Sequence, residues 1–241
     1  MAEGTRWLAD RLAVVTGASR GIGAASARAI AAAGAHVVLA ARSGEALERE
    51  AEGIREAGGD ATAVPTDVSS EQDVERLFET VARHGPLAAL VCAAGMLEPA
   101  SFPDTNTELW EQTLAVNLTG TFLCCRAAFG AMRAAGGGRI VNIASLSGVY
   151  GTEKFPGLAA YNVSKYGVVG LTEAIAVEGR ELGVGAVCLS PGAVDTEMLA
   201  RANPELRPGL TPDAVAELIV SLLEGPLEAT SGANIPLFSN A

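Results

Sequence analysis

The residues best suited to chemistry are Tyr161 and Lys165, which lie four positions apart in one predicted helix. That spacing places both side chains on one helix face. A phenol has a pKa of about 10 and is a poor proton donor or acceptor at neutral pH. A neighbouring ammonium group stabilises the phenolate and lowers that pKa. The pair therefore predicts a tyrosine that transfers a proton, although an exposed helical pair without function has the same pattern.

Three further polar residues lie upstream of this pair. The apolar run Arg139–Ala144 predicts a buried strand whose carboxyl end delivers Ser145 and Ser147 to the sheet edge. Asn117 sits inside the otherwise apolar stretch Leu114–Leu123, where a buried amide needs a hydrogen-bond partner. For Asn117 the simpler interpretation is a core amide bonded to the backbone.

A glycine turn near the amino terminus predicts a phosphate site. Leu12–Val15 is typical of a strand, and the alanine-rich stretch Ala24–Ala33 is typical of a helix. Between them, Gly17, Gly21 and Gly23 allow a tight turn and a close approach of a ligand. The free N–H groups and positive dipole of the helix start favour an anion there. A tight turn that holds no ligand would look the same.

Composition limits the possible functions. The 241 residues carry a net charge of −11, which argues against general binding to nucleic acid or anionic membranes. No apolar run reaches the roughly 18 residues of a membrane span. Charged residues interrupt the amino terminus, so no secretory signal is expected.

The cysteines and histidines predict no metal site. Cys92, Cys124, Cys125 and the Cys188 thiol lie in apolar segments without metal-type spacing, as expected for buried, reduced thiols of a cytoplasmic protein. The two histidines are isolated in the sequence, which leaves no support for a histidine triad.

Apolar strands and helical stretches alternate along the whole chain. The predicted strands are Leu12–Val15, Ala35–Ala41, Ala61–Thr66, Leu87–Cys92, Arg139–Ala144, Val184–Leu189 and Ala233–Phe238. Three of the predicted helices between them are Ala24–Ala33, Glu45–Ala57 and Ala160–Leu182. Two more begin with a capping box: Ser69 with Gln72 opens a helix to about Arg83, and Thr105 with Glu108 opens one to about Ala135. The last begins at Thr211-Pro212 and ends at about Leu223. Ser43 is the expected cap of the second helix.

This alternation predicts the α/β class: a doubly wound (Rossmann) parallel sheet of about seven strands with helices on both faces, forming one domain over residues 1–241. Ligands are expected at the carboxyl ends of the strands.

Taken together, these motifs resemble the short-chain dehydrogenase/reductase family. The resemblance rests on Thr16-Gly17-x-x-x-Gly21-x-Gly23, Asp67-Val68, Asn117, Ser145, Tyr161-x-x-x-Lys165 and Pro191-Gly192-Ala193-Val194-Asp195-Thr196, in this order. It covers residues 8–238, which is essentially the whole chain.

The resemblance implies a role for each matching residue. Tyr161 would be the general acid for ketone reduction or the base for alcohol oxidation. Ser145 would bond the substrate oxygen, with Ser147 as a weaker candidate. Lys165 would lower the Tyr161 pKa and bond the nicotinamide ribose. Asn117 would hold a water that relays protons from Lys165 to solvent.

The end of the second strand favours NADP(H) over NAD(H). NAD-type sites usually carry an acidic residue there, but this chain has Ala41 followed by Arg42. Arg42 offers donors for a 2′-phosphate, Arg20 is a second cation within reach, and Ser43 adds a hydroxyl. Taken alone, Arg42 could equally be a solvated loop cation.

The remaining cofactor contacts follow from the resemblance. Asp67 and Val68 would meet the adenine, and residues 93–95 would line the ribose through their backbone. The segment after the sixth strand would hold the nicotinamide carboxamide. The full predicted cofactor set is Gly17, Ser19, Arg20, Gly21, Ile22, Gly23, Arg42, Ser43, Asp67, Val68, Ala93, Ala94, Gly95, Tyr161, Lys165, Pro191, Gly192, Val194 and Thr196.

Four departures from the family pattern carry expectations of their own. Cys92-Ala93-Ala94-Gly95 replaces the usual Asn-Asn-Ala-Gly, so less local rigidity is expected. The Ser145–Tyr161 spacing is longer, and its extra residues, 150–156, form either a substrate-facing flap or a surface loop. The segment Glu197–Leu210 is short, which suggests an open pocket. The usual Gly-Gly near the carboxyl terminus is missing, which weakens the case for a subunit interface there.

The predicted function is an NADP(H)-dependent carbonyl reductase or alcohol dehydrogenase acting on a small-molecule carbonyl or alcohol. Candidate substrates are a 3-oxoacyl thioester, a sugar or polyol, a steroid-like alcohol or a small ketone. A 3-oxoacyl-[acyl-carrier-protein] reductase comes first on frequency, although no basic cluster marks a dock for the carrier. The alternatives are a non-catalytic nucleotide-binding regulator, or a dehydratase or epimerase. A cytoplasmic homodimer or homotetramer is expected.

Overall fold

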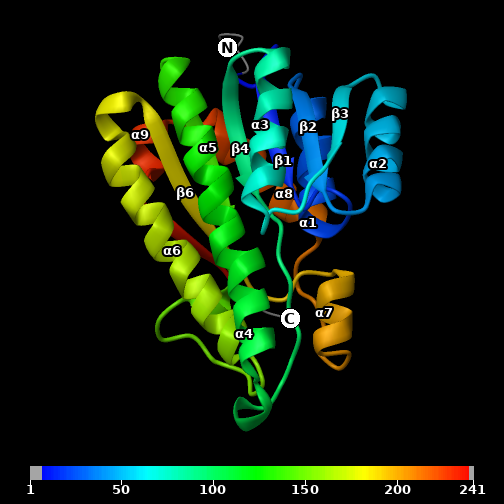
Figure 1. The fold of residues 1–241 in the computed structure, drawn as a ribbon, viewed down its shortest axis with the longest axis vertical. Helices are drawn as coiled ribbons and strands as arrows, with labels where there is room; N and C mark the ends of the chain where they lie inside the picture. Colours follow the sequence, from blue (N-terminus) through cyan, green and yellow to red (C-terminus); the bar gives the residue numbers. More distant parts are fainter. Residues whose placement is uncertain (1–6, 239–241) are drawn as a thin grey trace.

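The computed structural model describes residues 7–238, which form a seven-stranded, wholly parallel sheet in the order β3-β2-β1-β4-β5-β6-β7 (Figure 1). The strands are β1 Leu12–Thr16, β2 His36–Ala41, β3 Asp60–Pro65, β4 Leu87–Cys92, β5 Gly138–Ile143, β6 Val184–Pro191 and β7 Asn234–Leu237. Each predicted strand is present within two residues of its expected bounds, so the doubly wound sheet is confirmed.

Helices cover both faces of this sheet. The larger ones are α1 Gly21–Ala32, α2 Gly44–Glu56, α3 Glu71–His84, α4 Thr107–Leu114, α5 Gly120–Ala134, α6 Ala159–Gly179 and α8 Pro212–Glu224, with shorter helices α7 Glu197–Ala202 and α9 Leu227–Thr230. Helices α1, α2 and α8 pack with one core cluster. Helices α3 and α5 pack with the second cluster, in front of the sheet together with α6 in the view of Figure 1.

Alternating side chains of each strand feed the two clusters. In β1, Ala13 and Val15 join the α1 side, whereas Leu12 and Val14 join the α3 side. All five residues of β1 are buried, as are all six of β4. A strand buried on both faces must be apolar throughout, which explains the continuous apolar runs in the sequence.

The cap of α3 lies one residue later than predicted. Ser70, rather than Ser69, accepts a hydrogen bond from the Asp73 backbone N–H at 3.3 Å. The Ser69 hydroxyl instead donates to the Asp67 carboxylate at 2.6 Å. Because a hydroxyl used in the preceding turn is not free to cap, the prediction of Ser69 with Gln72 was wrong.

The cap of α4 differs in the same way. Asn106 accepts from the Leu109 N–H at 2.8 Å, while the Thr105 hydroxyl donates to the Ser101 carbonyl at 3.0 Å. The expected cap at Thr105 was therefore wrong by one residue, for the same reason.

The two other predicted caps fare differently. Thr211 caps α8 as expected and accepts from the Ala214 N–H at 3.2 Å. Ser43 occupies the cap position of α2 but makes no side-chain cap hydrogen bond.

The long helix expected from Thr105 to Ala135 is interrupted. Between α4 and α5 the residues Ala115–Thr119 form a π-helical turn, and the Gly120 N–H reaches back to the Ala115 carbonyl. Such turns often mark functional sites, and this one carries Asn117. By length and composition alone, the stretch Thr107–Ala134 could also cross a membrane. Apolar core helices of soluble proteins pass the same test, so the finding carries little weight, although no such segment was expected.

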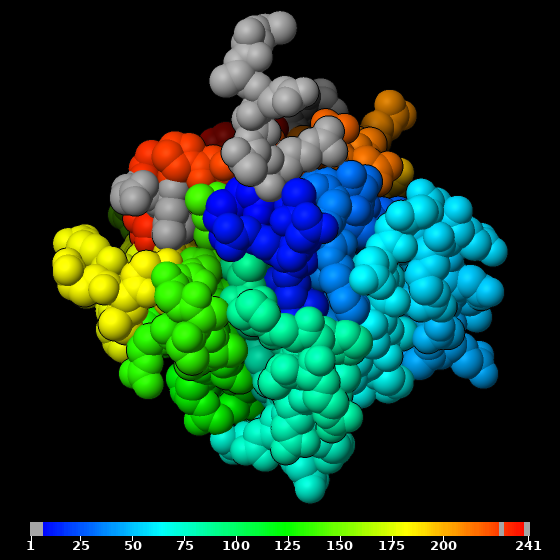
Figure 2. Space-filling view, turned by 90° about the horizontal axis from the view of Figure 1, so that it is seen from above, coloured from blue at the N-terminus to red at the C-terminus, as the bar shows by residue number. Residues whose placement is uncertain are grey.

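The two histidines, at the start of β2 and the end of α3, come together at the end of the sheet from which the strands start. Figure 2 shows the molecule from above, with the blue amino-terminal segment between the cyan and green segments. The histidine rings lie 4.6 Å apart, edge to face, beside a pocket of about 410 Å³ that Asp60 also lines. His36 Nδ1 is 3.3 Å from the Asp60 carboxylate, and Nε2 is 2.9 Å from the Thr62 hydroxyl. Burial lowers the pKa of His36 below its ordinary value of 6.5, and His84 lowers it further against the opposing effect of Asp60.

Stability should therefore fall in mildly acidic solution. Because the folded-state pKa is lowered, the contribution of His36 is complete above its unfolded pKa and is lost as the pH falls through the folded value. We expect the urea concentration at the unfolding midpoint of the wild type to be lower at about pH 5 than at about pH 7.5. In His36→Gln this difference between the two pH values should be smaller. Equal pH dependence of the two proteins would contradict this assignment.

Candidate active site

A cleft of about 1810 Å³ opens at the carboxyl ends of the strands. Its lining includes every residue of the predicted cofactor set, together with Ser145 and Ser147. Among the predicted site residues, only Asn117 lies outside the lining. The sheet thus brings together residues from seven separate segments of the chain, as the parallel topology requires.

The glycine turn after β1 is packed against backbone on two sides. A Cβ on Gly17, whose φ is +67°, would lie 2.7 Å from the Ala94 backbone, and one on Gly23 would lie 2.2 Å from the Gly17 carbonyl oxygen. The first turn of α1 has no acidic residue, and its cap residue Arg20 makes no side-chain cap. The positive end of this helix therefore faces the cleft without a built-in negative partner, which suits a phosphate.

Helix α6 presents Tyr161 and Lys165 to the cleft from its first turns. The Lys165 side chain is buried, its Nζ donates to the Ile143 carbonyl at 2.9 Å, and this nitrogen lies 5.6 Å from the centre of the Tyr161 ring. Burial lowers the pKa of Lys165 to about 8, although the Cys188 and Cys92 thiols oppose that change. Ser145 follows β5 and accepts from the Ser147 N–H at 3.1 Å.

The pKa of Tyr161 departs from expectation. Burial raises it above its ordinary value, and a hydrogen bond with Ser145 offsets part of that rise. The sequence predicted a net lowering by Lys165. In the fold, the removal of the phenol from water dominates, and the ammonium group is held by the Ile143 carbonyl. The phenol is therefore protonated at neutral pH.

Asn117 lies beneath the cleft and is completely buried. Its Oδ1 accepts from the Met96 N–H at 2.7 Å, and its Nδ2 donates to the Met96 carbonyl at 2.9 Å and to the Ser164 hydroxyl at 3.0 Å. These contacts fit the simpler interpretation, a core amide bonded to backbone, and leave the second lone pair of Oδ1 available to a water. A Cβ on Gly95 would lie 3.4 Å from Asn117 Oδ1 and 3.7 Å from Lys165 Nζ, so the amide and the ammonium flank the same residue.

These contacts hold the segment where Cys92-Ala93-Ala94-Gly95 replaces the usual amides. The Ala94 N–H donates to the Thr16 hydroxyl at 3.3 Å, and Met96 is fixed by Asn117 as described above. The Cys92 thiol packs 3.9 Å from the Cys125 thiol, and all four cysteines are free and buried, as expected. The connection after β4 therefore keeps backbone and side-chain ties on both sides of the substituted positions.

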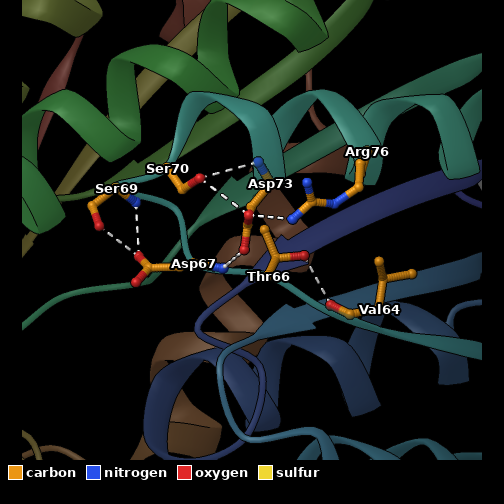
Figure 3. A network of polar contacts seen from close by, with 7 residues as sticks. All are labelled: Val64, Thr66, Asp67, Ser69, Ser70, Asp73 and Arg76. Carbon is orange, nitrogen blue, oxygen red and sulfur yellow. Dashed lines mark hydrogen bonds and ion pairs between the residues drawn. The ribbon is translucent and has the colours of Figure 1, made fainter.

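The loop after β3 is ordered by its own side chains (Figure 3). The Asp67 carboxylate accepts from the Ser69 N–H at 2.9 Å, and the Asp67 N–H donates to the Asp73 carboxylate at 3.1 Å. That bond, with a second from Ser70, lowers the pKa of Asp73. Asp67 is thus held in place at the cleft edge, with its carboxylate already partnered.

Basic residues gather at the cofactor end of the cleft. Arg42 is exposed at the end of β2, as expected. Arg20 is not free: its guanidinium lies 2.9 Å from the Glu197 carboxylate on α7, which Arg201 also approaches at 3.6 Å. Arg28 and Arg49 line the same end, and sequence reasoning missed both, since only the packing of α1 and α2 places them there.

Two segments close the other end of the cleft. The loop of residues 150–156 contributes Tyr150, Phe155 and Pro156 to the lining, so it borders the cleft, as a substrate-facing flap would. Facing it, the short helix α7 contributes Met198 and Leu199. We missed this helix, whose signal was its cap at Thr196, which accepts from the Leu199 N–H.

Known oxidoreductases resemble this chain in sequence. Residues 11–207 match the short chain dehydrogenase family. The chain is 37% identical over 197 residues to the oxidoreductase YxjF of Bacillus subtilis, covering 81% of this chain and 76% of that protein. It is 35% identical over 237 residues to cis-4-hydroxycyclohexanecarboxylate dehydrogenase of Sinomonas cyclohexanicum, covering 93% and 94%.

Solved structures of dehydrogenases resemble this fold. A short-chain type dehydrogenase/reductase from Mycobacterium marinum has a TM-score of 0.90 at 31% identity, covering 96% of this chain and 95% of that one. A Beutenbergia cavernae protein with bound NADP, described as an NAD(P)-dependent gluconate 5-dehydrogenase, has a TM-score of 0.89 at 33% identity, covering 97% and 98%.

A methyl group in the glycine turn should separate the turn's role from general helix stability. We expect Gly23→Ala to destabilise the protein by about 1–3 kcal/mol because the new Cβ collides with backbone, and to abolish dinucleotide binding. Gly53→Ala, a matched control in the middle of α2 with nothing within 4 Å of the new carbon, should stabilise by about 0.5–1 kcal/mol. Urea unfolding and NADPH fluorescence titration report the two effects. Normal NADPH affinity in Gly23→Ala would contradict the role of the turn.

Proposed function

The chain belongs to the short-chain dehydrogenase/reductase family and is an oxidoreductase of that family, and on this premise we propose that it transfers a hydride between NADP(H) and a carbonyl or alcohol carbon, with Tyr161 as general acid or base. The observation that carries the proposal is the meeting of Tyr161, Lys165 and Ser145 in the same cleft as the glycine turn. The whole chain would act as one domain.

The residues present fit a dinucleotide. Gly17 and Gly23 allow the turn to pack so tightly against backbone that a Cβ at either position would collide, and the uncapped start of α1 offers N–H groups to a diphosphate. Asp67 and Val68 would lie against the adenine, and the backbone of residues 93–95 would line the ribose. The segment of β6 and its end, with Pro191, Gly192, Val194 and Thr196, would hold the carboxamide.

When bound, the nicotinamide supplies the hydride. In reduction, the Ser145 hydroxyl donates a hydrogen bond to the substrate oxygen as negative charge grows on it. Tyr161 then gives its proton to that oxygen and regains one from solvent. The phenol is protonated at neutral pH, as an acid for reduction must be, but burial raises its pKa and so weakens it as an acid. The Lys165 ammonium would stabilise the phenolate left behind and bond the ribose. Asn117 would hold a water on the path from Lys165 to solvent.

Several features support NADP(H) over NAD(H). The cofactor end carries Arg42 with no carboxylate at Ala41, and the Ser43 hydroxyl lies beside it. Arg20 would add a second cation if the incoming phosphate displaced Glu197. The related B. cavernae protein holds NADP.

Self-association and location are also proposals. Phe122 on α5 and Val163, Tyr166 and Val177 on α6 are exposed apolar side chains, which supports a homodimer or homotetramer formed through these helices. Free, buried cysteines support a reducing, cytoplasmic setting.

Removal of the phenol hydroxyl tests the catalytic assignment. We expect Tyr161→Phe to lose about 10²–10⁴-fold in kcat for NADPH oxidation across a ketone panel, with an unchanged Kd for NADPH. Tyr166→Phe, which removes a phenol hydroxyl bonded to the Val149 carbonyl instead, should keep most of its activity. Unchanged turnover in Tyr161→Phe would favour a non-catalytic regulator or a different chemistry such as dehydration or epimerisation.

The cofactor preference has its own test. Loss of a charged hydrogen bond to the 2′-phosphate should raise the Kd for NADPH by about 10–100-fold in Arg42→Ala, while the Kd for NADH stays the same. Fluorescence titration of both cofactors measures this. Equal affinities for NADPH and NADH in the parent protein would overturn the preference.

A further inference from the structure

Charge is unevenly distributed along the cleft. Its four arginines, Arg20, Arg28, Arg42 and Arg49, all come from the first fifty residues, at the cofactor end. Asp67 and Asp213 line the same end, and Arg28 is paired there with Glu50 at 2.6 Å. At the other end of the cleft, on the far side of Tyr161 from the glycine turn, the described lining residues include no lysine, arginine or histidine. The charged side chains at this end are Glu153, Asp195 and Glu197, all carboxylates. Lys165, at the boundary, is bonded to the Ile143 carbonyl.

The loop before α6 forms an apolar wall of this end. Val149, Tyr150, Phe155 and Leu158 line it, with Tyr150 92% exposed and Phe155 42% exposed. Large apolar side chains held open to water at a cleft mouth favour an apolar ligand.

The one lysine of this loop is turned away from the cleft. Lys154 Nζ donates to the Leu146 carbonyl at 3.0 Å, the Val149 carbonyl at 2.6 Å and the Thr152 hydroxyl at 2.7 Å. Its charge therefore fixes the loop backbone and is not offered to a substrate.

A second apolar wall is formed by other elements. Met198, Leu199 and Leu206 face the cleft from α7 and the segment after it, and Leu97 does so from the connection after β4. Phe238, 60% exposed, lies at the rim. Ser145 and Tyr161 are the polar groups placed to meet a reacting oxygen between these walls.

We propose that the substrate is a neutral, apolar ketone or its secondary alcohol, of medium chain length or alicyclic, and not a carboxylic acid; this rests on the proposed function. A substrate carboxylate would meet Glu153 and find no free cation among the described lining residues of this end. An alkyl or cycloalkyl group gains from burial against both walls.

This assignment sets the chain apart from two of its relatives. Gluconate, named for the B. cavernae protein, is both charged and polyhydroxylated. Cyclohexanecarboxylate derivatives, named for the S. cyclohexanicum enzyme, carry a ring that fits these walls and a carboxylate that does not. The two features can be separated by experiment.

Initial rates of NADPH oxidation test the substrate class. Across the methyl ketones from 2-butanone to 2-octanone, we expect kcat/KM to rise by up to about fourfold per added methylene, the factor that full burial of each group provides. Methyl 4-oxocyclohexanecarboxylate should exceed the free 4-oxo acid by at least about tenfold, and 5-ketogluconate should be slower still. A free acid as good as its ester, or a flat response to chain length, would overturn the inference.

Single substitutions test which side chains set the preference for apolar ketones. Phe155→Ser should lower kcat/KM for 2-octanone several-fold more than for 2-butanone. Phe102→Ser, at an exposed phenylalanine away from the cleft (79% exposed), should change neither. Glu153→Gln should narrow the gap between ester and acid. The same loss for both ketones in Phe155→Ser would assign Phe155 a structural role and contradict its place in the substrate wall.

Binding separates this inference from the proposed reaction. The same compounds are titrated calorimetrically into the protein saturated with NADPH. If the long-chain ketones and the ester bind more tightly than the acid but none is turned over, the proposed reaction fails and the ligand class holds. If the acid or 5-ketogluconate is turned over, the reaction holds and this inference fails. If none of the apolar compounds binds, this inference is overturned as well.

Discussion

Direct backbone contact between the glycine turn and the residues after β4 is the constraint on which the site depends. Gly17 touches the Ala94 backbone so closely that no Cβ fits between them. The next residue, Gly95, lies beside both Asn117 and Lys165. Three consecutive small residues, Ala93, Ala94 and Gly95, thus join the glycine turn to Lys165 through packed backbone. A larger side chain at any contact would separate the two halves of the cleft.

Asn117 completes this connection from below. Its amide ties the Met96 backbone to Ser164, whose hydroxyl in turn donates to the Tyr161 carbonyl at 2.7 Å. The segment after β4 and the first turn of α6 are therefore held together by one buried side chain. The π-helical turn at residues 115–119 carries that side chain, so an irregular piece of helix has a clear structural use here.

The charged side chains of the cleft are divided between its two ends. The protein is strongly acidic overall, with a net charge of −11, yet arginines gather where a dinucleotide phosphate would lie. Apolar side chains and carboxylates line the other end. Such a distribution would favour an anionic cofactor at the arginine end and a neutral molecule at the other. The Arg20–Glu197 ion pair links the glycine turn to helix α7.

The sequence by itself determined the strands and a parallel sheet covered by helices on both faces, and its predicted site residues, apart from Asn117, all line the cleft. These depend on local features: continuous apolar runs, glycines at a turn, and a Tyr–Lys spacing that one helix face translates directly into proximity. Tertiary structure alone decided that Glu197 pairs with Arg20, 177 positions away, that Asn117 bonds Met96, that Arg28 and Arg49 face the cofactor end, and that the Tyr161 pKa rises. Each of these depends on which groups from distant elements meet and on how much water they exclude. The pattern of apolar residues along the chain predicts neither these contacts nor the exclusion of water, because both arise only when the helices pack onto the sheet.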